Sequence, residues 1–149
     1  METTTLLRGH VERVLQEHWH QHHLVVDGDG DYPFRAGRAM CWVSVQGEPA
    51  AVQVFAQAVR GVKRSAKLLA EVNELSGSAR WVKVFWHDDT VFVSRILDLD
   101  GADAGSIRRA CDTVAAVAQD IAPMRAAVFG GEPPLPPEVE HADGEREIG

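Results

Sequence analysis

The 149-residue chain has little cysteine, no long apolar run and no recognisable leader. Its two cysteines, Cys41 and Cys111, lie far apart without the spacing of a metal site, which favours a reducing compartment over a disulfide framework. No apolar run approaches the ~20 residues that span a bilayer, and residues 1–15 lack the basic start and apolar centre of a signal peptide. We therefore expect a cytoplasmic protein without a membrane partner.

Basic residues are also outnumbered: the chain has 15 lysines and arginines and 22 aspartates and glutamates. The excess is concentrated in residues 131–149, GEPPLPPEVEHADGEREIG, which hold six acids, one arginine, four prolines and no aromatic residue. Such a segment cannot bury enough apolar surface to offset its ordering entropy. We expect one domain over residues 1–130, followed by an acidic, proline-rich disordered tail. The near-neutral body argues against a nucleic-acid partner, which needs a basic face.

Linear catalytic motifs are absent as well. The sequence has no GxGxxG loop, no serine in a nucleophile elbow and no pair of acids in an apolar setting. Cys41 stands between Met40 and Trp42, with no adjacent basic residue to lower its pKa. These absences predict a protein that is not an enzyme, although residues distant in sequence can still meet in space to form a site.

The stretch EHWHQHHLVVDGDGDYPF, residues 17–34, holds four histidines and three aspartates. His18 and His22 lie four apart, so on a helix two imidazoles could reach one metal ion. Their face continues the apolar stripe of the same helix, however, and no third ligand follows at a recognisable spacing. The histidines are therefore predicted to close an amphipathic helix rather than to bind metal.

The aspartates Asp27, Asp29 and Asp31 occupy the first, third and fifth positions of an EF-hand-like loop. Tyr32 replaces the glycine that such a loop needs for its sharp turn, and Arg38 replaces its final glutamate. We expect a Gly/Asp turn and no metal. A small-ligand or metal sensor that uses His18, His22 and this turn is the alternative function.

Two other polar clusters have simple explanations. WHDD, residues 86–89, falls where two strand patterns meet and predicts a solvated hairpin turn. RGVKRSAK, residues 60–67, gathers four basic residues at the start of a helix, where an anion could bind. A solvated basic patch that faces acidic groups elsewhere in the chain is the favoured interpretation.

Hydrophobic periodicity predicts an α+β domain with the order α-β-β-β-α-β-β-α. Helices separated by runs of antiparallel strands favour a sheet with the helices packed on one face. Pro123 is expected to bend or interrupt the last helix. The predicted helices span residues 3–22, 65–79 and 103–130, and the predicted strands span 23–26, 34–46, 50–59, 80–86 and 90–99.

Strand alternation separates small aliphatic residues from large aromatic ones. Cys41, Val43, Val52 and Val54 suit packing under helices, whereas the opposite face would hold Trp42, Phe55, Trp81 and Phe85. Monomers rarely expose such an apolar set, so it predicts a binding or dimerisation surface. The alternative is that the faces are reversed or that a helix covers the aromatic side.

From residue 68 to residue 131 the chain resembles the bacterial YbjN-like family, whose fold is that of CesT-like type III secretion chaperones. The resemblance rests on the VNEL helix (residues 72–75), the strand WVK (residues 81–83) and the AAVFGG ending (residues 126–131). Ser76 stands where the family pattern often has a second asparagine. Over the first sixty residues only the order of the elements agrees.

The resemblance implies a chaperone-like fold that tends to dimerise and to bind extended peptide on an apolar surface, with no cofactor and no catalytic residues. We therefore expect a non-enzymatic peptide-binding chaperone or adaptor that acts as a homodimer on a protein or peptide client. The predicted binding residues are Trp42, Phe55, Trp81 and Phe85.

Overall fold

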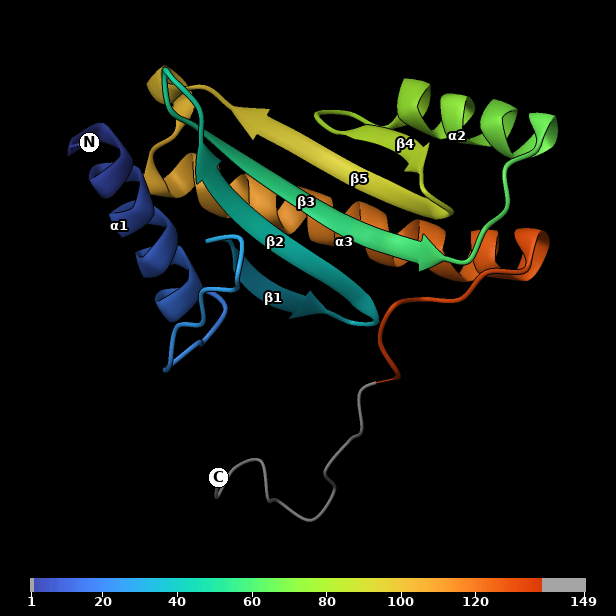
Figure 1. Ribbon diagram of the computed structural model, residues 1–149, viewed down its shortest axis with the longest axis horizontal. Helices are drawn as coiled ribbons and strands as arrows, with labels where there is room; N and C mark the ends of the chain where they lie inside the picture. Colours follow the sequence, from blue (N-terminus) through green and yellow to red (C-terminus); the bar gives the residue numbers. More distant parts are fainter. Residues whose placement is uncertain (1, 138–149) are drawn as a thin grey trace, which may run out of the picture.

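Five antiparallel strands and three helices make up residues 2–137, the part of the chain that this computed structural model describes (Figure 1). The predicted fold class and element order are confirmed. The three α-helices are α1 (Glu2–Glu17), α2 (Ala66–Ser78) and α3 (Ala104–Phe129), and a 3-10 turn, η1 (Leu99–Gly101), precedes α3. The strands are β1 (Tyr32–Ala36), β2 (Ala39–Gln46), β3 (Ala51–Arg60), β4 (Lys83–His87) and β5 (Thr90–Leu97).

The strands form one sheet in the order β1-β2-β3-β5-β4, and every neighbouring pair is antiparallel. Tight turns close the hairpins where the backbone takes a positive φ. Gly37 (φ 61°) joins β1 to β2, and Asp88 (φ 52°) and Asp89 (φ 60°) join β4 to β5. Two consecutive residues in this conformation match the right-handed twist of the strands that they connect. The hairpin turn expected at WHDD is therefore confirmed.

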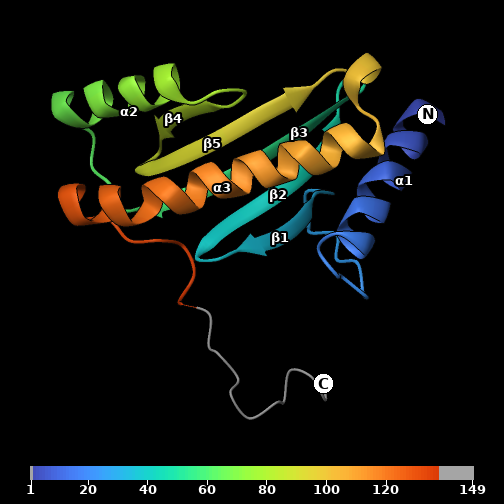
Figure 2. The same cartoon turned by 180° about the vertical axis from the view of Figure 1, so that it is seen from behind.

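All three helices lie on one side of the sheet. Helix α3 crosses β2, β3 and β5, lying behind them in Figure 1 and in front of them in Figure 2, and contacts each of these strands. Helix α1 packs against α3 and β2, and α2 packs against β4. The core between the helices and the sheet combines small strand residues with an apolar stripe from each helix. Its fully buried members include Leu7, Val11, Leu15, Cys41, Val43, Val52, Val54, Leu68, Val91, Val93, Ile107 and Cys111.

Side-chain caps set the ends of α2 and α3. Ser65 precedes α2 and accepts a hydrogen bond from the amide of Leu68, and Asp103 precedes α3 and accepts one from the amide of Ser106. At the other end of α3, Gly130 takes the left-handed conformation (φ 82°) that ends many helices. Helix α3 nevertheless continues through Pro123, so of the bend or interruption expected there, the interruption does not occur. None of the helices in residues 2–137 is long and apolar enough to cross a bilayer.

Three predictions for the first half of the chain are wrong: the end of the first helix, a short strand after it and one long strand. Helix α1 ends at Glu17 rather than His22, and His20 already takes a positive φ of 56°. Residues 23–26 form no strand, because they have no neighbour in the sheet, and Val25 remains 55% exposed. The single strand expected over residues 34–46 is a hairpin instead, since Gly37 turns the chain between β1 and β2.

The first part of the predicted tail, residues 131–137, lies against the body of the domain. The backbone groups of Glu132 and Arg60 exchange two hydrogen bonds of 2.7 and 2.9 Å. Leu135 pairs through its backbone with Arg38, and the Arg35 guanidinium donates to the Pro136 carbonyl. The remaining residues of that prediction, 138–149, lie outside the described part of the chain.

Candidate functional site

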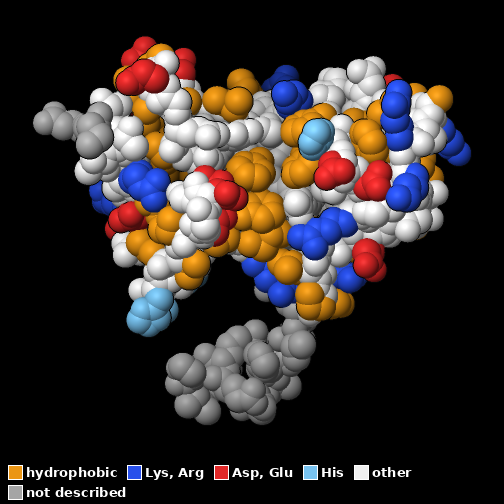
Figure 3. Space-filling model, viewed as in Figure 1, with side chains coloured by type: hydrophobic (Ala, Val, Ile, Leu, Met, Phe, Trp, Pro, Cys, Tyr) orange, Lys and Arg blue, Asp and Glu red, His pale blue; other side chains and the backbone are white. Residues whose placement is uncertain are grey.

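The face of the sheet opposite the helices, here called the open face, has no described helix over it (Figures 1 and 2). Side chains that alternate with the buried ones point to it from all five strands. Figure 3 shows hydrophobic side chains gathered over the centre of this face, with charged groups around them. The open-face residues include Arg35, Met40, Trp42, Gln53, Phe55, Gln57, Lys83, Phe85, Phe92, Ser94 and Ile96.

Two stacked aromatic pairs form the centre of the open face. Trp42 and Phe55 are cross-strand partners whose ring centroids lie 5.2 Å apart with an interplanar angle of 16°. Phe85 and Phe92 form the matching pair on β4 and β5, at 5.3 Å and 16°. All four side chains are partly exposed. Cross-strand stacking fixes their rings, so the face offers a preformed apolar platform.

Three of the four predicted binding residues, Trp42, Phe55 and Phe85, therefore share one surface. Phe92 completes it and was missed by the sequence reasoning. The signal was present in the sequence, because Phe92 alternates with Val91 and Val93 as Phe55 does with its neighbours.

Polar groups on the open face are neutral or cationic. Gln53 donates to the Ser94 hydroxyl at 3.0 Å, and Arg60 at the end of β3 donates to Gln57 at 2.8 Å. The ammonium group of Lys83 lies 5.1 Å from the centre of the Phe85 ring. None of the five strands contains an aspartate or a glutamate. The strands therefore present an apolar centre with polar and basic groups beside it.

The fourth predicted residue, Trp81, does not join this surface. It precedes β4 in a positive-φ conformation (φ 72°), and its side chain is 67% exposed. The Arg95 guanidinium lies over its ring at 5.6 Å and donates to its carbonyl at 2.8 Å. Arg95 pairs in register with buried Val54, so it points to the helix side of the sheet. Trp81 accordingly lines a cleft of about 710 Å³ between the end of β5 and α3, together with Arg109.

The histidines and aspartates of residues 17–34 do not assemble into one site. His18 Nε2 lies 2.8 Å from Asp112 Oδ1 on α3, so this ring ties the end of α1 to its neighbour. His22 is exposed and lies beyond the end of the helix, in irregular backbone. The two imidazoles therefore do not share the helical face that a common metal ion would need.

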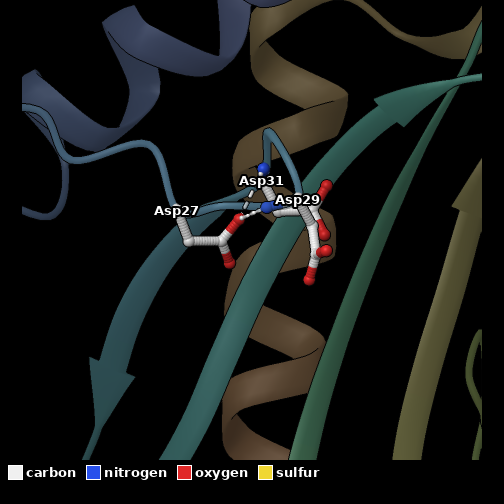
Figure 4. A group of neighbouring side chains, drawn as sticks. All are labelled: Asp27, Asp29 and Asp31. Carbon is white, nitrogen blue, oxygen red and sulfur yellow. Dashed lines mark hydrogen bonds between the residues drawn. The ribbon is translucent and has the colours of Figure 1, made fainter.

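The turn that contains Asp27, Asp29 and Asp31 is stabilised by hydrogen bonds within itself. Asp27 Oδ1 accepts hydrogen bonds from the amides of Asp29 and Asp31, both at 2.9 Å (Figure 4). One carboxylate thus satisfies two backbone donors, as expected of a Gly/Asp turn. Oxygen atoms of the three carboxylates lie within 4.8 Å of one another. Exposed acidic groups often gather in this way without an ion, and the turn geometry explains their positions.

The two cysteines lack the setting of a nucleophile. Both are buried, and burial raises the pKa of the Cys41 thiol to about 12 and that of Cys111 above its ordinary range. At neutral pH both thiols are protonated, and the thiolate is the reactive form. They act as small apolar residues in the core, as their sequence context predicts.

Comparison with known proteins gives the family. The model of the "T3SS (YopN, CesT) and YbjN peptide-binding chaperone 1" family matches residues 5–137. No curated protein matches the chain. Among solved structures, a chain of the HopA1–SchA chaperone–effector complex superposes with a TM-score of 0.64 at 6% identity, covering 80% of this chain and 95% of that one.

Two further structures share the fold. A chain of the ExsC–ExsE complex has a TM-score of 0.61 at 11% identity, covering 78% of this chain and 93% of that chain. YbjN from E. coli has a TM-score of 0.56 at 14% identity, covering 86% of this chain and 94% of that one. At these identities the superpositions establish the fold, and the family model establishes membership. The chain belongs to the family of type III secretion and YbjN peptide-binding chaperones.

Proposed function

We propose that this protein is a non-enzymatic chaperone or adaptor that binds an extended apolar segment of a client protein on the open face of its sheet. Membership of a peptide-binding chaperone family supports the class of function. The observation that carries the choice of surface is the pair of aromatic stacks, Trp42–Phe55 and Phe85–Phe92, on a face that no described helix covers.

The physical argument for this surface is the unfavourable free energy of leaving its apolar side chains exposed to water. An enclosed aromatic side chain buries about 150–250 Å², and apolar burial contributes about 25 cal/mol per Å². The rings of the open face are partly exposed in the described chain, so a client segment laid over them would remove further apolar area from water. Gln53 and Gln57 beside them are partly exposed and offer hydrogen bonds that orient a bound backbone without demanding a particular sequence.

A homodimer is the second element of the proposal. It is what the resemblance to CesT-like chaperones implies, and it requires a contact between copies that leaves the open face to the client. Light scattering across a range of protein concentrations measures the oligomeric state directly. A mass of twice 16.3 kDa is expected, and a monomer at every concentration would contradict the dimer while leaving client binding to be tested separately.

Client binding is tested with an array of short peptides graded in aliphatic and aromatic content. The intact protein is expected to bind the apolar members, and Phe55→Thr and Trp42→Thr should each weaken that binding by about tenfold, which corresponds to about 1.4 kcal/mol. Threonine retains the strand propensity of both positions, so the fold should survive.

The matched control is Trp81→Asn, which removes an equally large and more exposed aromatic group away from the open face. Asparagine tolerates the positive φ at this position. Unchanged thermal unfolding in all three variants shows that the domain is intact. Loss of binding in Trp81→Asn alone would place the client in the Trp81–Arg95 cleft and contradict the proposal.

A further inference from the structure

The cleft of about 710 Å³ between the end of β5 and α3 has the size of a small-molecule site. Strand β4 pairs with β5 only as far as Ser94, so residues 95–97 have no strand beside them on that side within the described part of the chain. The positive φ of Trp81 ends the strand pattern at this point, and its side chain lines the cleft. Sites for small organic molecules typically measure about 300–1,000 Å³, so a ligand of that class fits.

The Trp81 side chain is held in place without being buried. A bulky residue rarely adopts a φ of 72°, and residues in such conformations are concentrated at binding sites. The side chain is 67% exposed, so burial contributes little to offset the strain. The Arg95 guanidinium lies over the ring, 5.6 Å from its centre, and donates to the Trp81 carbonyl at 2.8 Å. These two contacts fix an aromatic surface in the wall of the cleft.

Two arginines in the cleft keep unused hydrogen-bond donors. Arg95 donates through Nη1 to Trp81, and Arg109 donates through Nη2 to the Ser106 hydroxyl at 3.1 Å. Within residues 2–137 neither guanidinium forms an ion pair, and Asp103, which caps α3, interacts with Arg109 only at longer range. Each guanidinium has five N–H donors in a planar fork that matches a carboxylate. The cleft therefore offers donors for a carboxylate ligand.

The acidic residues of the cleft limit the ligand to a single negative charge. Asp98 Oδ1 accepts a hydrogen bond from the Gly101 amide at 3.1 Å. Asp112 lies 2.8 Å from His18 Nε2 and 4.0 Å from Arg108 Nε. Both carboxylates thus have partners in the fold, but their negative charge remains near the two cleft arginines. A dianion such as phosphate would be disfavoured by repulsion, whereas one carboxylate would not exceed the positive charge available.

We propose that this cleft binds a small aromatic molecule that carries one carboxylate group. The aromatic ring packs against Trp81, and the carboxylate accepts hydrogen bonds from Arg95 and Arg109. Arg95 points to the helix side of the sheet, so the site is separate from the aromatic stacks of the open face. The inference goes beyond the proposed client binding and does not depend on it.

The test uses indole-3-acetate as the probe and indole-3-acetamide, which has the same ring and no charge, as the matched ligand. Each is titrated into the ¹⁵N-labelled full chain. The Trp81 indole signal and the amide of Arg109 are expected to shift with indole-3-acetate, with a Kd of about 1 mM. The amides of Phe55 and Gln57 on the open face should shift less. The acetamide should bind about tenfold more weakly, because it cannot form charge-assisted hydrogen bonds.

A pair of neighbouring arginines on α3 supplies matched variants. Arg109→Gln removes an exposed cation that lines the cleft, so it should weaken indole-3-acetate binding by about tenfold and leave acetamide binding unchanged. Arg108→Gln removes an equally exposed cation outside the cleft lining and should change neither. Trp81→Asn should weaken the binding of both ligands, since both place a ring against the indole. Unchanged thermal unfolding shows that each variant is folded.

Three results would overturn the inference. The first is no shift of the cleft signals at the highest soluble concentration of indole-3-acetate, or shifts confined to the open face. The second is equal affinity for the acetate and the acetamide, and the third is an equal loss of affinity in Arg108→Gln and Arg109→Gln. No client is present in these titrations, so each result leaves the proposed function to be tested separately.

Discussion

The two faces of the sheet use apolar residues in opposite ways. The covered face, under the helices, is built mainly from valine, alanine and cysteine, which let α3 approach closely. The open face carries the larger side chains Trp42, Phe55, Phe85 and Phe92, all partly exposed. Folding alone would place the largest apolar groups inside, because they gain most from burial. Their position on the uncovered face is the basis of our proposal that this face contacts another chain, although Tyr32 and Phe34 show that large aromatic residues are buried on the covered face too.

The largest expected effect comes from the same substitution made on each face. Ile107→Ala in α3 removes a fully buried side chain, and the free energy of unfolding should fall by about 2–5 kcal/mol. Ile96→Ala on β5 removes a side chain that is 61% exposed, so the loss should stay below about 1 kcal/mol. Urea denaturation measures both. Similar losses for the two variants would show that the open face is covered in solution.

A buried charge should matter more than an exposed one on the covered side. Arg125 of α3 is only 7% exposed and pairs with Glu71 of α2. Glu71→Gln leaves that cation without its carboxylate and should cost about 1–3 kcal/mol, less than for a fully buried pair because Glu71 is 39% exposed.

Arg125→Met provides the control for this pair. It removes the buried cation but keeps an apolar side chain, so it should cost less than Glu71→Gln in the same urea series. The exposed pair of Lys63 and Asp89 supplies the second comparison, since Lys63→Met should change stability little. A larger loss in Arg125→Met than in Glu71→Gln would mean that packing, rather than charge, dominates at this contact.

Thiol chemistry distinguishes the faces without disturbing the core. Cys41 and Cys111 should not react with a disulfide reagent at pH 8 until the protein unfolds, because burial raises both pKa values and blocks access. Gln53→Cys on the open face should react at a rate near that of a free thiol. Absorbance of the released thiolate follows both reactions, and rapid reaction of the wild-type protein would contradict the packing of α3 on β2.

The smallest effect is a change of stability at high pH. Burial, and then the hydrogen bond to Glu12, raise the pKa of Tyr32 from 10.0 to about 12. The unfolded chain therefore releases this proton first, so stability is unaffected below pH 10 and falls as the pH rises toward 12. Tyr32 is the only tyrosine, which makes its ultraviolet titration unambiguous. A midpoint near pH 10 in the folded protein would show that the ring is not held as described.

The sequence predicts the elements with regular periodicity and misses those defined by a single residue. The strand alternation around Trp42 and Phe55 gave their shared face correctly, and Ser65 marked the start of α2. Gly37 was read as part of one long strand, although its positive φ splits that strand into two. Such local turns leave little trace in a hydrophobic pattern.

The candidate site shows the same division. Trp81 has the right parity for the open face if the strand is continued backwards from Lys83, but its positive φ breaks the alternation and turns the ring toward Arg95. Phe92 follows the alternation and needed only the pairing of β4 with β5 to be recognised. Contacts between distant segments, such as His18 with Asp112, have no signature in the spacing of residues.

The central claim, that the open face is the client site, is tested most directly by site-specific photocrosslinking in the cells that make the protein. A benzophenone amino acid replaces Gln53 on the open face or, in the matched variant, Ala116 on the outer side of α3. We predict that Gln53 crosslinks to a client protein, and that adding Phe55→Thr to this variant reduces the yield. Crosslinks to the same client from Ala116 but not from Gln53 would contradict the account.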